Sequence, residues 1–172
     1  YIAIRNDVTE LEDYKHLLKL ELDTTNRSFE ENLHYISQYE RAVNSTIAVL
    51  KTDTNNIITY ANDTFCTLSG YAEKELIGLN CEVLRHPKHR ETGICKTIME
   101  RLSSGQAMNE VLTNLTKEGS EYIVDSLFYP ILDQSGNVIE HLQIMHDVTE
   151  IARLNEEIVN TQKEVVMTMG SI

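Results

Sequence analysis

The chain has 172 residues, which is enough for about one domain with extensions, and its hydrophobic content of 41% is sufficient for a packed core. The formal charge of −12 disfavours nucleic-acid binding and attraction to an anionic membrane surface. No apolar run approaches the roughly 20 residues of a membrane span, and three cysteines without a paired motif indicate reduced thiols, so we expect a cytoplasmic protein.

The tetrapeptide Asp-Val-Thr-Glu occurs twice, at residues 7–10 and 147–150. Each copy follows a short apolar run and precedes a helical pattern. The Asp and the Glu also have the spacing of a capping box. Both copies therefore predict a strand that turns directly into a helix. We expect residues 1–10 to be the last strand of a preceding domain of the same kind, so that the chain is a piece of a longer array.

Residues 11–45 are polar and contain no Gly or Pro, which favours one helical linker. Asp23-Thr24-Thr25-Asn26 is weakly helical and predicts a break near residues 23–27. The apolar residues follow steps of three, four or seven, a narrow stripe typical of a coiled coil. We expect a second copy of the chain to cover this stripe in a homodimer. Its members are Leu18, Leu22, Phe29, Leu33, Ile36, Val43 and Ile47.

Residues 46–150 have the pattern of one domain. Two β-rich runs come first and three strands come last, with helical patterns between them. This order predicts an α+β fold, a five-stranded antiparallel sheet with its helices on one side. The strand at residues 120–132 is apolar on both faces, so we expect one face to line a cavity and the other to be covered. The expected strands are 46–53, 57–61, 107–117, 120–132 and 138–147, and the expected helices are 61–70, 72–78, 80–85 and 89–104.

Residues 151–172 carry a heptad pattern that predicts a C-terminal signalling helix of the coiled-coil type. The spacing alternates between three and four residues without interruption. The members are Ile151, Leu154, Ile158, Thr161, Val165, Thr168 and Ile172.

A series of short motifs runs through the central domain. They are Thr59-Tyr60-Ala61-Asn62-Asp63-Thr64-Phe65, Ser69-Gly70-Tyr71, Glu75-Leu76-Ile77-Gly78, Lys117-Glu118-Gly119-Ser120 and Asp147-Val148-Thr149. Their order and spacing resemble the PAS family of sensor domains. Leu84-Arg85-His86-Pro87 is most similar to bacterial aerotaxis receptors, which bind FAD. Residues 162–172 are similar to the segment that leads into an HD-GYP cyclic-di-GMP phosphodiesterase.

The resemblance implies a cavity with haem or FAD as possible cofactors. It implies that Arg85 could pair with an FAD phosphate, and that an imidazole in this region could be an axial haem ligand. Capping or surface roles for the two histidines stay open. The candidate cofactor-binding residues are Arg85, His86, His89, Asn114, Tyr122 and Met145.

Two other site types can be compared with this interpretation. Asn80-Cys81 matches the Asn-Cys of light-sensing LOV domains, but Val124 and Met145 stand where that subfamily carries Asn and Gln. We therefore expect Cys81 to be a small core residue. A cluster of Cys81, His86, His89 and Cys95 lacks a recognised zinc spacing, so no metal site is expected.

The resemblance implies that Asp147, Thr149 and Glu150 link the last strand to the helix that follows. They would act as a signal hinge, as a simple N-cap, or as both. The first functional hypothesis is a sensory and dimerisation module in a bacterial multi-PAS protein, covalently linked to an upstream PAS domain and a downstream output domain. The second is a relay without ligand, and the third, an enzyme, lacks a catalytic motif.

Overall fold

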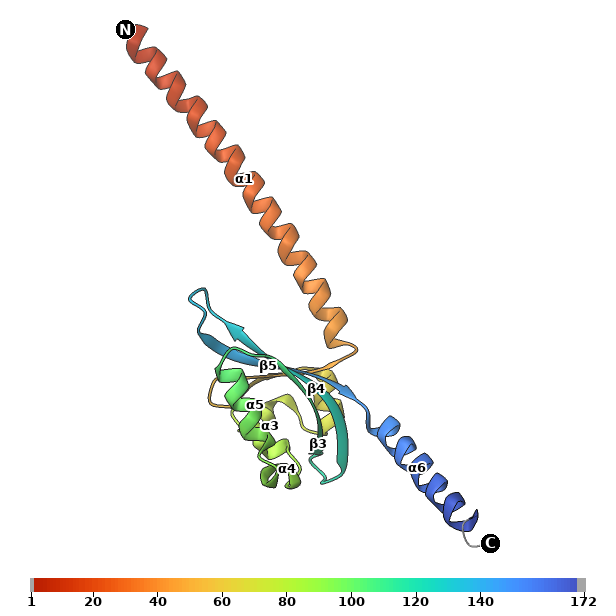
Figure 1. The fold of residues 1–172 in the computed structure, drawn as a ribbon. Helices are drawn as coiled ribbons and strands as arrows, with labels where there is room; N and C mark the ends of the chain where they lie inside the picture. The colour runs from red at the N-terminus through yellow and green to blue at the C-terminus, as the bar shows by residue number, and fades with distance from the viewer. Residues whose placement is uncertain (1, 170–172) are drawn as a thin grey trace. The chain divides into compact units, whose positions relative to one another are not determined.

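A computed structural model of the chain describes residues 2–169, without the side chains of 2–10, 90, 91, 165, 168 and 169. The chain divides into two units, residues 1–43 and 44–172 (Figure 1). The first unit is a single helix, and the second contains the sheet.

Helix α1 runs from Ile2 to Asn44 and corrects two predictions. Residues 2–10 are helical where a strand was predicted. A strand without neighbouring strands would leave its backbone N–H and C=O groups unpaired, whereas a helix pairs them within the segment. The predicted break near residues 23–27 is also absent. Thr24 and Thr25 instead donate their hydroxyl protons to the carbonyl oxygens of Leu20 and Glu21, at 2.7 and 2.8 Å, which fits both residues into a continuous helix.

The second unit is built on the predicted five-stranded antiparallel sheet, and the α+β prediction is confirmed. The strand order is β2-β1-β5-β4-β3, so the first and last segments of the domain meet in the middle of the sheet. The strands are β1 (Ala48–Thr52), β2 (Ile58–Ala61), β3 (Met108–Leu115), β4 (Glu121–Leu132) and β5 (Val138–Asp147).

The connection between β2 and β3 is helical and covers one face of the sheet (Figure 1). Its elements are α2 (Asp63–Ser69), α3 (Glu73–Leu76), the 3₁₀ turn η1 (Cys81–Leu84), α4 (Lys88–Glu91) and α5 (Ile94–Ser103). The helix predicted at 89–104 is thus divided in two. Gly93 separates the halves with a φ of 71°, a left-handed conformation that glycine adopts at little cost.

Asn62 joins the first strands to the first helix of this connection. Its Oδ1 accepts hydrogen bonds from the backbone N–H groups of Val49 and Phe65, both at 2.9 Å. Its Nδ2 donates to the carbonyl oxygen of Ile47 at 2.8 Å. One buried side chain therefore caps α2 and also fixes the start of β1.

Burial alternates along β4 and β5, but the buried face is mainly apolar on β4 and mainly polar on β5. On β4 the inward residues include the apolar Tyr122, Val124 and Phe128. On β5 the buried face carries His141, Gln143 and Met145, while Leu142 and Ile144 lie on the other face and are only partly buried. An inward polar face on a central strand departs from the usual binary pattern and is typical of a functional interior. The outer face of the sheet, expected to be covered, leaves these large apolar side chains exposed: Val111, Leu127 and Tyr129.

Helix α6 (Thr149–Met169) begins directly after β5, as predicted. Its apolar stripe is exposed at Ile151, Leu154 and Ile158, while the stripe position at Ile172 and the side chains of Val165 and Thr168 lie outside the described part of the chain. None of the described helices combines the length and hydrophobicity that a bilayer span requires.

Candidate functional site

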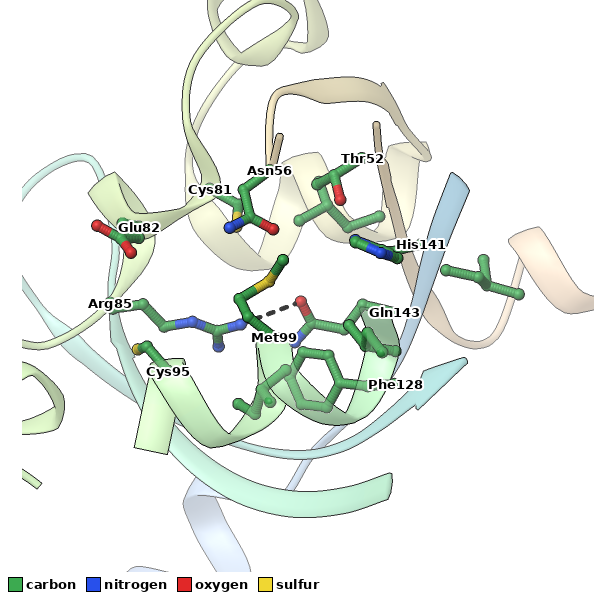
Figure 2. A pocket seen from close by; sticks show the side chains of 14 residues that line it. Thr52, Asn56, Cys81, Glu82, Arg85, Cys95, Met99, Phe128, His141 and Gln143 are labelled. Carbon is green, nitrogen blue, oxygen red and sulfur yellow. Dashed lines mark hydrogen bonds between the residues drawn. The ribbon is translucent and has the colours of Figure 1, made fainter. Parts of the chain in front are cut away.

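A cavity of about 40 Å³ lies between the inner face of the sheet, η1 and α5 (Figure 2). Its walls combine aliphatic and aromatic side chains with a cation, an imidazole and two primary amides. The lining residues are Leu50, Thr52, Asn56, Cys81, Glu82, Arg85, Cys95, Ile98, Met99, Leu102, Phe128, His141, Leu142 and Gln143.

Arg85 is the central polar residue of this cavity. The chain leaves η1 at this residue in an extended conformation, and Arg85 pairs with Asn114 in an isolated bridge. Pro87 keeps the next residue, His86, out of a helix as well. The bridge places the Arg85 guanidinium inside the domain, where the residue is only 7% exposed. Its Nη1 donates to Asn114 Oδ1 at 3.2 Å and its Nη2 to Gln143 Oε1 at 3.3 Å. The guanidinium carbon lies 5.4 Å from the centre of the Phe128 ring.

The hydrogen bonds of Arg85 extend into both neighbouring strands. Gln143 Nε2 donates to Ser126 Oγ at 3.1 Å, which links β5 to β4. Asn114 Nδ2 donates to the hydroxyl oxygen of Tyr122 at 3.4 Å, which links β3 to β4. Burial raises the pKa of Tyr122 to about 12, so its hydroxyl stays neutral near pH 7. The interior therefore holds one connected network with a single cationic member.

His86 lies outside this network. Its Nε2 is 3.2 Å from Glu121 Oε1, and its Nδ1 accepts from the backbone N–H of Lys88 at 3.1 Å. Both ring nitrogens are thus used at the surface. This placement agrees with the capping or surface role that the sequence analysis left open for His86.

His89 supports the edge of the sheet. Its Nε2 accepts from the backbone N–H of Thr113 in β3 at 2.9 Å, so the proton of the neutral ring is on Nδ1. Desolvation, together with the nearby cations Lys88 and Arg85, lowers the pKa of His89 from its ordinary value of 6.5. A protonated ring would lose the Thr113 bond because it has no acceptor.

We expect the free energy of unfolding to fall as the pH drops below about 6.5, where unfolded histidine takes up its proton. The folded pKa of His89 lies below that value, so its contribution is complete above pH 6.5 and is lost towards the folded pKa. Urea unfolding at several pH values measures the slope, and His89→Gln should reduce it. Burial also lowers the pKa of His141, so this residue should maintain part of the pH slope in the His89→Gln variant. An unchanged slope in His89→Gln would contradict this assignment.

The cavity does not fit a haem or a flavin in this conformation. Pockets for ligands of that size measure about 300–1,000 Å³, against about 40 Å³ here. The ring nitrogens of His86 and His89 are engaged as described above, and both terminal nitrogens of the Arg85 guanidinium already bond to Asn114 and Gln143. Met145 is buried on β5 but does not line the cavity.

The cysteines near the cavity are ordinary thiols. Cys66, Cys81 and Cys95 are free and half-buried. Burial raises the pKa of the Cys81 thiol, so the reactive thiolate is disfavoured. Within the described residues, no group of three or more His, Cys, Asp or Glu side chains is arranged to hold a metal ion, so the cluster of Cys81 and Cys95 with the two histidines does not form.

Two buried residues of the cavity were missed by sequence reasoning: His141 and Gln143. Gln143 is 7% exposed and completes the bonds of Arg85. His141 is 5% exposed, and its Nδ1 is buried without a hydrogen-bond partner. Both occur at alternate positions with Met145, and Leu142 and Ile144 separate them. The sequence shows that this strand has a more polar face and an apolar face. It does not show which of the two faces is buried.

The junction after β5 brings Asp147 and Thr149 together with β4. Asp147 Oδ1 accepts from the backbone N–H of Thr149 at 2.9 Å and from its hydroxyl group. Thr149 Oγ1 in turn accepts from the backbone N–H of Ile123 at 2.9 Å, and Val148 donates its N–H to the Ile123 carbonyl oxygen at 2.9 Å. Glu150 lies exposed in the first turn of α6, where a carboxylate is favourable. The start of α6 is therefore bonded to β4 as well as continuous with β5.

Comparison with protein families matches residues 45–150 to the PAS domain. The chain is 34% identical over 132 residues to the sensor histidine kinase TmoS of Ectopseudomonas mendocina, covering 74% of this chain and 13% of the kinase. It is 27% identical over 117 residues to the aerotaxis receptor of Escherichia coli, covering 67% of this chain and 23% of the receptor.

The solved structures include a light-oxygen-voltage domain studied with a flavin analogue, with a TM-score of 0.60 and 27% identity. That match covers 74% of this chain and 96% of the solved chain. The chain spans less than a quarter of the length of the two sequence relatives, so the comparison concerns the domain and not their whole architecture. The sheet order, the helical connection and the family match agree, and the chain belongs to the PAS domain family.

Proposed function

We propose that this chain is the sensory and dimerisation module of a bacterial signalling protein, and that it relays the state of its interior to α6. The observation that supports this proposal is the pair of bonds between Ile123 in β4 and the first residues of α6. They make the position of the helix depend on the sheet that lines the cavity.

The route starts at Arg85. A displacement of the guanidinium would change its hydrogen bond to Gln143 on β5. Gln143 in turn bonds to Ser126, so the change would reach β4. Both strands continue to the junction: Val124 pairs with Asp147, and Ile123 holds Thr149. A two-state shift of the network would thus move the start of α6, provided that the bound and free states differ in their interactions there.

The proposed partners follow from the two flanking helices. On α1, Leu18, Leu22 and Phe29 are 46%, 59% and 63% exposed, and the stripe of α6 is exposed as well. Exposed coiled-coil stripes favour a homodimer of this chain. A cytoplasmic location is part of the same proposal. We further propose that an upstream PAS domain and a downstream output domain flank the module, and that a cyclic-di-GMP phosphodiesterase of the HD-GYP type is one such output.

Replacing Thr149 by valine tests the bonded junction on which the proposed relay depends. Valine keeps the shape but cannot accept from the Ile123 N–H, so we expect amide hydrogen exchange at Ile123 to speed up by about ten-fold, the equivalent of roughly 1.4 kcal/mol for one lost bond. Thr161→Val is the matched control on α6, because the Thr161 hydroxyl bonds only within the helix, to the Glu157 carbonyl oxygen. Equal exchange in both variants would count against a bonded junction.

A relay without ligand is the second candidate function, and the small volume of the cavity favours it. In that case the module would pass on movement from α1 without binding anything. FAD or haem stays a prediction from the family resemblance, and the similarity to a flavin-related structure supports the flavin alone. The visible absorption spectrum of the purified chain tests both directly.

A further inference from the structure

Arg85 forms no ion pair with a described residue. The buried guanidinium contacts two neutral amide oxygens and the face of Phe128, and no described carboxylate forms an ion pair with it. Glu82 lines the same cavity but is exposed to solvent. A buried charge without a counter-charge is costly, and such a group usually has a partner.

Unused hydrogen-bond donors accompany this charge. A guanidinium group has five N–H donors, and its two recorded side-chain bonds leave the others available. His141, which lines the same cavity from β5, is 5% exposed and has a buried Nδ1 without a partner (Figure 2). Arg85 follows η1 and His141 lies on β5, and both line the cavity, so a ligand there would meet a cation and an unpartnered ring nitrogen.

We propose that the cavity binds a small planar oxyanion, held by Arg85 and His141. Planar carboxylates and nitrate match the guanidinium fork in two parallel hydrogen bonds. About 40 Å³ corresponds to roughly three water-sized positions, which limits the ligand to the size of formate, nitrate or acetate. This inference rests on the proposed sensory function and gives it a ligand class.

Titration of the full 172-residue chain with sodium formate or sodium nitrate tests the proposal, with each salt replacing sodium chloride at constant ionic strength. We expect a saturable rise in the thermal midpoint and saturable shifts of the Gln143 and His141 signals in NMR spectra. Arg85→Gln should weaken the apparent affinity at least ten-fold. A rise without saturation, or one of equal size in Arg85→Gln, would overturn the proposal.

Gln143→Glu supplies a second test that does not remove the cation. The new carboxylate would stand where the amide oxygen now accepts from Arg85 and would replace the external anion. We expect this variant to have a higher midpoint without added anion and to lose the response to formate. Retention of the full response in Gln143→Glu would contradict binding at Arg85.

Lys96→Gln is the matched control, since Lys96 is an exposed cation that lines the surface depression next to the cavity, as Arg85 does, but does not line the cavity itself. The formate response should be unchanged in this variant. A response lost in Lys96→Gln but kept in Arg85→Gln would locate the anion at the surface and overturn the proposal. Failure here is distinguishable from failure of the relay, because the Ile123 exchange measurement in Thr149→Val involves no ligand.

Discussion

Replacing Asn62 by alanine is expected to lower the free energy of unfolding by about 3 kcal/mol. The loss of an N-cap costs about 1 kcal/mol, and each buried backbone group left without a partner costs about 1–3 kcal/mol more. Asn62 is 3% exposed and satisfies the N–H groups of Val49 and Phe65 as well as the carbonyl oxygen of Ile47. Urea unfolding monitored by circular dichroism measures the change.

The control is Asn80→Ala, which removes an N-cap of the same residue type. Asn80 Oδ1 accepts one bond, from the Glu82 N–H at 3.0 Å, and the residue is only partly buried. Its loss should cost about 1 kcal/mol. If Asn62→Ala were no more destabilising than Asn80→Ala, the link between β1 and α2 would contribute nothing beyond a cap.

The second large effect is expected for Asn114→Leu, a change that keeps the volume of the side chain but removes its polar atoms. Arg85 loses one of its two acceptors and the Tyr122 hydroxyl loses its donor. A hydrogen bond to a charged group contributes about 1.5–3 kcal/mol, and the charge left behind is buried. We expect the free energy of unfolding to fall by about 3 kcal/mol in thermal or urea unfolding.

Asn109→Leu on the same strand is the matched control. Asn109 is exposed, so its replacement should change stability by less than about 0.5 kcal/mol. A result near zero for both variants would mean that the guanidinium finds other partners when Asn114 is removed.

Most of the fold was predictable because its segments have clear periods and strong turn signals. Thr54-Asn55-Asn56 predicted the first hairpin, and Asp53 Oδ1 indeed accepts from the N–H groups of Asn55 and Ile57. The errors arose at two places where the sequence pattern does not distinguish between alternative structures. A helical period passes through Gly93 without a break, and an apolar run such as residues 1–6 predicts a strand or a helix depending on its neighbours.

The candidate site was predictable only in part. Arg85, Asn114 and Tyr122, selected by family resemblance, do lie together in the interior. His86 and His89 follow Arg85 closely in sequence, but Pro87 redirects the chain, and their rings bond to Glu121 and to the Thr113 backbone. His141 and Gln143 carry no motif. Their importance depends on which face of β5 is buried, and that depends on partners far away in the sequence.

The unusual orientation of β5 gives the hairpin between β4 and β5 a role beyond connection. Displacing β5 by one residue would turn Leu142 and Ile144 inward and expel Gln143, an exchange that hydrophobicity alone would favour. Asp133 opposes this slip at the tip, where its Oδ1 accepts from the N–H groups of Ser135 and Asn137. The length of this five-residue tip, remote from the guanidinium, thus determines whether the interior is polar and responsive or aliphatic and inert. An insertion in the tip would therefore abolish the response of the domain without changing any cavity residue.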